Sequence, residues 1–248
     1  MVVVTISSSI TFLTGLSLAA LATNMRIRGG GAYFVISRTL GVEAGAAMGL
    51  PLYMAQALGI AFYCTGFAES VVEIFPDVNI RTVGVITLIV VAAIAWISAD
   101  LALRTQLIVM TIIFLSLGSL FIGGAPDPMP AVDPKNFEGF KGFWVVFAVF
   151  FPAVTGIEAG IAMSGDLKDP AKSLPRGTLG AVVTGYAVYM LIPLFLSFTL
   201  GVDKEARQLL IENKMIMREM ARWGKVVVAG VWAASLSSAM GAILGAPR

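Results

Sequence analysis

The chain has 248 residues, of which 58% are hydrophobic and only 13% are charged, and its mean hydropathy is +0.89. Because a soluble domain is typically about one quarter charged, this composition excludes an ordinary water-soluble fold and predicts an all-α polytopic membrane protein. The net charge of +2 and the lack of a basic stretch argue against a nucleic-acid partner, and the absence of histidine excludes a histidine-ligated metal site.

About seven apolar segments are long enough to cross a lipid bilayer as helices, which takes roughly 17–25 residues each. The first lacks a basic region before its apolar run, so we interpret it as a spanning helix and not as a signal peptide. In chain order the expected spans are about Val2–Thr23, Ala44–Val72, Arg81–Ser98, Thr105–Ile122, Gly142–Met163, Thr178–Leu200 and Lys225–Ala246.

Small hydroxylated residues line the first span at helical spacing. They are Ser7, Thr11 and Thr14, with Ser8, Gly15 and Ser17 alongside. Such a face lets helices approach closely in lipid, which favours helix packing over direct contact with a ligand.

Residues 203–222 mix charged and apolar side chains between the last two spans. This pattern predicts a short amphipathic helix that lies at the membrane interface. We expect residues 1–248 to form a single membrane domain that includes this interfacial segment.

The fifth span contains the most informative stretch, Phe150–Gly160, which holds a proline, two glycines, a threonine and a glutamate. Pro152 removes an amide and crowds the preceding turn, so we expect the helix to break or unwind here. Backbone released at membrane depth must be buried in protein or line a polar cavity. A broken helix with an intramembrane carboxylate, Glu158, indicates a substrate or ion site of a transporter.

Four ordered blocks, residues 28–41, 61–70, 150–160 and 164–178, together resemble the cation–chloride cotransporters of the sodium–potassium–chloride type. These proteins are a branch of the amino acid–polyamine–organocation permease superfamily. The resemblance implies two five-helix inverted repeats, with the first helix of each repeat broken. In that register the chain covers family helices two to eight and is truncated at both ends, without the first broken helix.

The resemblance also implies three ion sites, whose chemistry suits the residues present. Carbonyls at the end of a half-helix attract cations, amides at the start of the next one attract anions, and hydroxyls suit sodium. The implied residues are Tyr63, Pro152 and Thr155 for potassium, Gly156, Ile157 and Glu158 for chloride, and Ala234, Ser237 and Ser238 for sodium.

Glu158 departs from the pattern of the familiar eukaryotic members, which have an apolar residue at this position. A carboxylate there could act as a tethered anion that replaces chloride, as a proton-coupling group, or as a protonated residue that only donates a hydrogen bond. These alternatives stay open.

The resulting expectation is a secondary active transporter that couples sodium and/or potassium to chloride across the plasma (cell inner) membrane, without enzymatic activity or a cofactor. One alternative is an amino acid or polyamine permease of the same superfamily. Another is a transport-inactive membrane fragment that lacks the first broken helix. The family resemblance further implies a possible homodimer.

Overall fold

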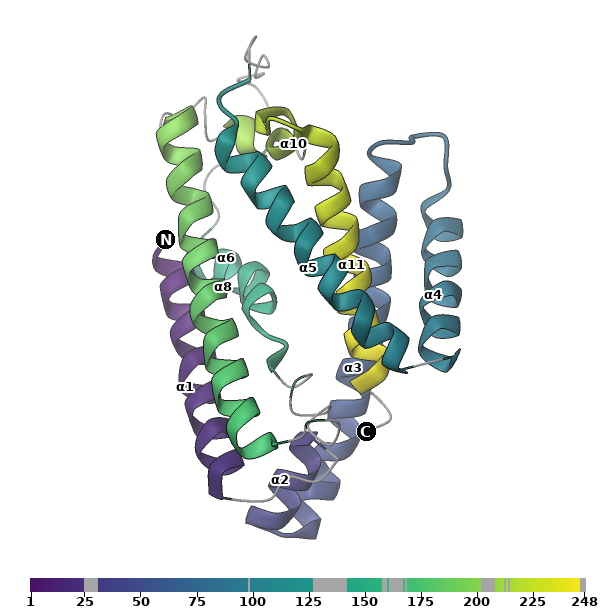
Figure 1. The fold of residues 1–248 in the computed structure, drawn as a ribbon, viewed down its shortest axis with the longest axis vertical. Helices are drawn as coiled ribbons and strands as arrows, with labels where there is room; N and C mark the ends of the chain where they lie inside the picture. The colour runs from purple at the N-terminus through teal and green to yellow at the C-terminus, as the bar shows by residue number, and fades with distance from the viewer. Residues whose placement is uncertain are drawn as a thin grey trace. The chain divides into compact units, whose positions relative to one another are not determined.

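The computed structural model describes residues 1–24, 31–97, 99–126, 142–157, 160, 167, 169–201, 208–211, 213 and 215–245. All regular elements in these ranges are helical (Figure 1). In chain order they are α1 (Val2–Asn24), α2 (Gly31–Leu40), α3 (Val42–Val72), α4 (Ile80–Ile97), α5 (Ala99–Ile122), α6 (Phe143–Phe150), the 3₁₀ helix η2 (Phe151–Val154), α8 (Pro170–Leu200), α10 (Ile216–Met220) and α11 (Gly224–Gly245).

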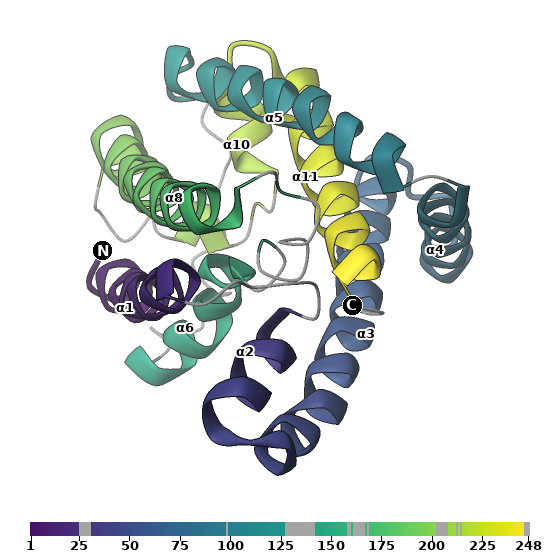
Figure 2. The same ribbon diagram turned by 60° about the horizontal axis from the view of Figure 1, so that its bottom comes forward.

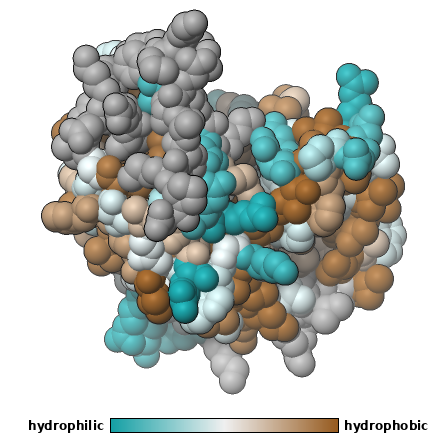
Figure 3. All heavy atoms as spheres, turned by 90° about the horizontal axis from the view of Figure 1, so that it is seen from above, coloured by the Kyte–Doolittle hydropathy of each residue, from teal (hydrophilic) through white to brown (hydrophobic). Residues whose placement is uncertain are grey.

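Six of the described helices are long and apolar enough to cross a membrane, which confirms the prediction of an all-α polytopic membrane protein. They are α1, α3, α4, α8, α11 and the Thr105–Ile122 part of α5. Large apolar side chains such as Trp96 and Phe198 are almost fully exposed, and apolar residues reach the surface in Figure 3. Exposed apolar surface along long helices is what contact with lipid requires.

Three expected spans differ clearly from the helices of the structure. Helix α5 begins at Ala99 and not at the expected Thr105. The expected span Gly142–Met163 is not one continuous helix, because its first helical segment ends at Val154. Helix α8 begins at Pro170, well before the expected Thr178, since the first turn of a helix tolerates proline and the Asp169 carbonyl accepts the amides of Lys172 and Ser173. Two further prolines, Pro175 and Pro193, lie inside α8.

The helices form two compact units, of which the first lies within Met1–Pro51 and Lys135–Phe198. In this unit α1 lies beside α8 in both views (Figures 1 and 2), and Gly15 faces the side chains of Leu179 and Thr178. A Cβ atom at Gly15 would lie 3.6 Å from Leu179, so the helices meet at ordinary contact distance. The prediction that the small face of the first span packs against another helix holds at this glycine.

The second unit lies within Leu52–Pro134 and Thr199–Pro247 and contains α4, α5, α10, α11 and most of α3. Its core joins α3, α4 and α11 through Cys64, Val91 and Ala239, among others. Helices α5 and α11 run side by side in Figures 1 and 2, and a Cβ atom at Gly230 would overlap Ser116. Only glycine permits this close approach.

The expected amphipathic segment 203–222 falls partly outside the described residues. Its described part includes the short helix α10, and Leu209, Ile216 and Met220 are buried within the protein. The following chain is bound to the end of α5, because the Arg222 amide donates to the Ser119 carbonyl over 2.9 Å. Its placement at a membrane interface stays a prediction.

Candidate functional site

The break in the α6–η2 segment follows directly from its sequence. Helix α6 gives way to the 3₁₀ turn at Phe151, where Pro152 has no amide to continue the α-helical ladder. Thr155 is then extended, and Gly156 has a φ of +104°, a conformation that favours glycine. The chain is helical again at Ile157. The predicted unwinding at this position is therefore present in the structure.

Thr155 closes the end of the first half-helix. Its amide and its hydroxyl both donate to the Pro152 carbonyl, over 3.3 and 2.7 Å. These are two of the residues expected at a potassium site, and the structure brings them into direct contact. The Thr155 hydroxyl proton is used in this bond, so its oxygen presents lone pairs to the surroundings.

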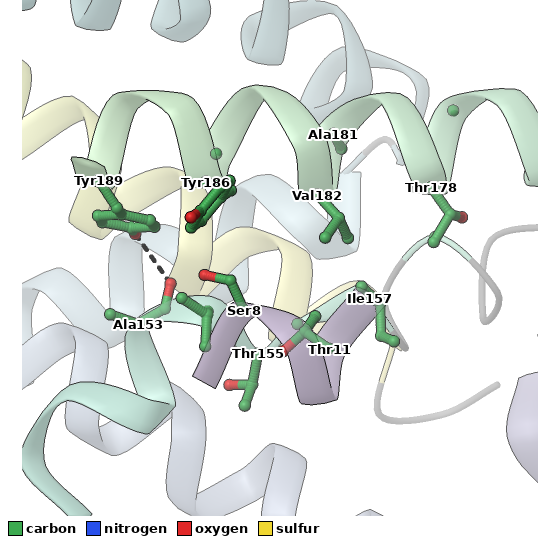
Figure 4. Close-up of a pocket in the computed structure, with 15 residues that line it drawn as sticks. Ser8, Thr11, Ala153, Thr155, Ile157, Thr178, Ala181, Val182, Tyr186 and Tyr189 are labelled. Carbon is green, nitrogen blue, oxygen red and sulfur yellow. Dashed lines mark hydrogen bonds between the residues drawn. The ribbon is translucent and has the colours of Figure 1, made fainter. Parts of the chain in front are cut away.

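A cavity of about 390 Å³ adjoins the break within the first unit. Figure 4 shows that α1, the broken segment and α8 each contribute side chains to it. Its lining residues are Ser8, Thr11, Ala153, Val154, Thr155, Gly156, Ile157, Gly160, Gly177, Thr178, Ala181, Val182, Gly185, Tyr186 and Tyr189. Gly156 and Ile157, expected at a chloride site, thus line a cavity, whereas Glu158 lies outside the described residues.

Helix α8 holds the broken segment through Tyr189. The Tyr189 hydroxyl donates to the Ala153 carbonyl over 2.8 Å, as the dashed line in Figure 4 shows. The ring of Tyr189 also meets Phe150 edge-on, with 5.5 Å between ring centroids. This hydrogen bond satisfies a carbonyl beside the break, where the regular helical ladder stops.

Helix α1 presents a buried hydroxyl to the same cavity. Ser8 is 6% exposed, and its Oγ atom has no hydrogen-bond partner in the structure. The neighbouring Thr11 hydroxyl donates to the Ser7 carbonyl over 3.2 Å. Ser8 and Thr11 are thus buried on α1 and also line the cavity.

The remaining expected potassium residue, Tyr63, belongs to the second unit. It packs against the core that includes Ile60 and Val91, and its ring meets Phe62 edge-on at 5.8 Å. Pro152 and Thr155 belong to the first unit, so a potassium site that joins the three residues stays a prediction.

The expected sodium residues lie on α11 in the second unit. Ser237 is half-buried and donates a hydrogen bond to the side-chain carbonyl of Gln106 on α5. Ala234 is half-buried on the same helix, whereas Ser238 is exposed. Among the described residues, no group of three or more cysteine, aspartate or glutamate side chains forms a metal centre.

A family model for amino acid permeases matches residues 1–248. The chain belongs to the amino acid permease family. This family consists of membrane transporters and not of enzymes, and the chain is an integral membrane protein.

The chain is similar to members of solute carrier family 12. It is 31% identical to solute carrier family 12 member 1 of Mus musculus, over 99% of the chain and 28% of that protein. It is 32% identical to member 2 of Homo sapiens, over 99% and 25%, and 30% identical to member 2 of Squalus acanthias, over 100% and 26%. The chain thus spans about a quarter of the length of these relatives. The matches confirm the predicted relationship to the cation–chloride cotransporters.

Three residues that contact the broken segment, the cavity or Ser237 were not anticipated from the sequence. Tyr189 and Gln106 bond to partners 36 and 131 residues away, so no local pattern reveals them. The second tyrosine, Tyr186, lies one helical turn before Tyr189 and lines the same cavity. Two tyrosines at this spacing on one face of an apolar helix are the only local signal.

Proposed function

We propose that the chain acts in a secondary active transporter that couples sodium and/or potassium to chloride across the plasma membrane. The observation that carries the proposal is the break at Pro152–Gly156, which opens an apolar helix onto a cavity. Unwound backbone is tolerated at membrane depth where it lines such a cavity, and transporters use it to bind ions. The relationship to the cation–chloride cotransporters supports ions as the transported species.

In this proposal each ion uses a different kind of group. Potassium uses oxygens of Tyr63, Pro152 and Thr155, because carbonyl and hydroxyl oxygens replace the hydration of a cation. Chloride uses backbone amides at Gly156, Ile157 and Glu158, where a half-helix begins. Sodium uses Ala234, Ser237 and Ser238, whose carbonyl and hydroxyl oxygens suit a hard cation.

The second candidate is transport of an amino acid or polyamine, and the size of the cavity favours it. A space of about 390 Å³ with mostly apolar walls exceeds what a bare ion needs and falls within the usual range for small organic ligands. Glu158 would then interact with the amino group of the solute.

The deciding experiment measures rubidium uptake into liposomes that contain the purified 248-residue chain. Replacing chloride with gluconate, or sodium with N-methylglucamine, should lower uptake by about tenfold. Ser237→Ala should raise the sodium concentration for half-maximal uptake by about fivefold, because one oxygen ligand is lost. The matched control is Ser235→Ala, whose hydroxyl only bonds the Val231 carbonyl of its own helix over 2.9 Å.

The alternatives give different results in the same liposomes. Alanine or putrescine uptake that both Glu158→Gln and Glu158→Leu abolish, without chloride-dependent rubidium uptake, would favour the organic solute. Uptake of neither ions nor organic solutes would show that the isolated chain is inactive. Chloride-dependent rubidium uptake that survives both Glu158 changes would remove Glu158 from the mechanism.

A further inference from the structure

We infer that Pro51 is a hinge at which α3 bends, so that the two ends of this helix move separately. Among the described helices, only α3 has several turns in each compact unit, because the boundary between the units falls between Pro51 and Leu52. Such a hinge does not depend on which solute the chain transports, so it goes beyond the proposed function.

The first end of α3 is bound to the first unit through α2, which lies beside the first turns of α3 in Figures 1 and 2. A Cβ atom at Gly45 would lie only 2.6 Å from the Cβ atom of Ser37, so the two helices meet at close range. Val35 on α2 in turn forms a buried apolar cluster with Ala22 on α1 and Leu174 on α8. Residues of α3 before Pro51 therefore move with α1, α2 and α8.

The other end of α3 is packed into the core of the second unit. Ile60 and Cys64 are buried in one cluster with Val91 on α4 and Ala239 on α11. Ala68, one turn after Cys64, is completely buried. Because close-packed side chains leave little room for independent movement, this end of α3 moves with α4 and α11.

The stretch of α3 between these two ends has little packing of its own. All residues from 46 to 59 are described, and none of them is buried. The large exposed apolar side chains of this stretch are Met48, Leu50, Tyr53, Met54 and Leu58. Lipid can cover such side chains, but it does not fix the curvature of a helix as a close-packed core does.

Pro51 lies near the middle of this exposed stretch. It has no amide proton, so the carbonyl of Ala47, one turn earlier, does not receive a hydrogen bond from residue 51. A change of about 20° in the bend of a helix at such a point moves an atom about 20 Å away by roughly 7 Å. The weakest point of α3 thus coincides with the boundary between the two units, as expected of a hinge between two rigid bodies.

The other described connection between the units does not need such a hinge. The chain passes from the first unit to the second after Phe198, and α8 ends at Leu200. Gly201 follows with a φ of +89°, so the helix stops in a turn directly after the boundary. Without Pro51, continuous α3 would therefore be the stiffer of these two connections.

Distances between nitroxide spin labels test the hinge in the full chain reconstituted in liposomes. Cys64→Ala removes the only native thiol, and pairs of exposed residues are replaced with cysteine and labelled. Leu40→Cys with Ile122→Cys reports on the distance between the units. Val2→Cys with Leu40→Cys lies within the first unit, and Trp96→Cys with Ile122→Cys lies within the second. Double electron–electron resonance measures the distribution of each distance.

We expect the distribution between the units to be several ångströms broader than the two distributions within a unit. Adding Pro51→Ala should narrow it, because the restored amide completes the helical ladder. Pro193→Ala is the matched control and should leave it unchanged, since Pro193 also interrupts a spanning helix but lies inside the first unit. A distribution between the units as narrow as those within them, or one that Pro51→Ala narrows no more than Pro193→Ala does, overturns the inference.

Hydrogen exchange of the full chain in detergent gives a second measurement that needs no label. Amides of residues 52–58 should exchange faster than those of residues 60–68, and Pro51→Ala should slow their exchange by about fivefold, as expected for one regained hydrogen bond. Leu50→Ala changes an exposed neighbour without adding an amide and should not slow it. Equal exchange in the two segments, or equal slowing by the two substitutions, also overturns the inference. Absence of uptake in liposomes refutes only the proposed function, because neither measurement requires a transported solute.

Discussion

In the second unit α5 and α11 approach so closely that Gly230 leaves no space for a methyl group beside Ser116, whereas in the first unit α1, α8 and the broken segment surround a cavity. The polar groups differ in the same way. Ser119 is almost fully buried, and its hydroxyl donates to the Trp223 carbonyl and accepts the Trp223 amide, over 3.2 and 2.9 Å. Ser8 is also buried but has no partner. Glycine and serine therefore stabilise close helix packing in the second unit, whereas in the first unit they line a cavity.

The largest expected difference in stability is between Gly230→Ala and Gly180→Ala, which add the same methyl group at a tightly packed position and at an open one. Gly230→Ala should lower the free energy of unfolding by about 1–3 kcal/mol, because the new Cβ atom overlaps Ser116. Gly180→Ala on α8 has no atoms within 4 Å of its new methyl group and should stabilise the helix by up to about 1 kcal/mol. Thermal unfolding in detergent measures both, and equal changes would remove the contrast between the units.

Gly156→Ala tests the effect of backbone conformation without a steric overlap. No atom lies within 4 Å of the added methyl group, but a φ of +104° should cost a side-chain-bearing residue about 1–3 kcal/mol. We expect a lower unfolding midpoint together with reduced uptake in liposomes. Gly160→Ala is the control, because it also faces open space and does not have a positive φ. If uptake falls equally in the Gly156→Ala and Gly160→Ala variants, the positive φ of Gly156 is not what uptake requires.

Tyr189→Phe keeps the ring beside Phe150 and removes only the bond to the Ala153 carbonyl. The expected loss is about 1 kcal/mol of stability, because one hydrogen bond beside the break is removed; thermal unfolding in detergent measures it. Tyr186→Phe should have a smaller effect on stability, since its hydroxyl lies 3.4 Å from Thr5 Oγ1. If Tyr186→Phe lowers stability more than Tyr189→Phe does, the Tyr189 hydroxyl does not stabilise the broken segment.

The smallest effect is expected from replacing Gln106, because water can take its place as the hydrogen-bond acceptor of the half-buried Ser237. Gln106→Leu should cost less than about 1 kcal/mol of stability and raise the sodium concentration for half-maximal uptake about threefold. Gln106→Glu retains an acceptor oxygen and should preserve the sodium response. A sodium response that is unchanged in Gln106→Leu would show that this residue does not orient Ser237.

The sequence predicts those features that depend on neighbouring residues. Apolar length locates the spans, and Pro152 with Gly156 locates the break, because both act on the backbone within one turn. Hydropathy does not locate the start of α8 at Pro170, since the polar first turns are helical without being apolar. The helical break also reduces seven expected continuous spans to six in the described residues.

The partners of the site residues could not be predicted in the same way. The spacing of Ser7, Ser8 and Thr11 shows a polar face on α1 but does not show whether a helix or a cavity covers it. The bonds from Tyr189 to Ala153 and from Ser237 to Gln106 depend on how helices distant in sequence come together. Glu158, whose role the sequence left open, lies outside the described residues.

Pro193 makes α8 easier to bend than a helix of the same length without an internal proline. A proline contributes no amide proton, so the carbonyl of Tyr189, one turn earlier, does not receive its hydrogen bond from residue 193. Bending a helix is least costly at such a point. The residue whose hydroxyl donates to the Ala153 carbonyl thus lies one turn before Pro193, so we expect bending of α8 at this point to displace the broken segment.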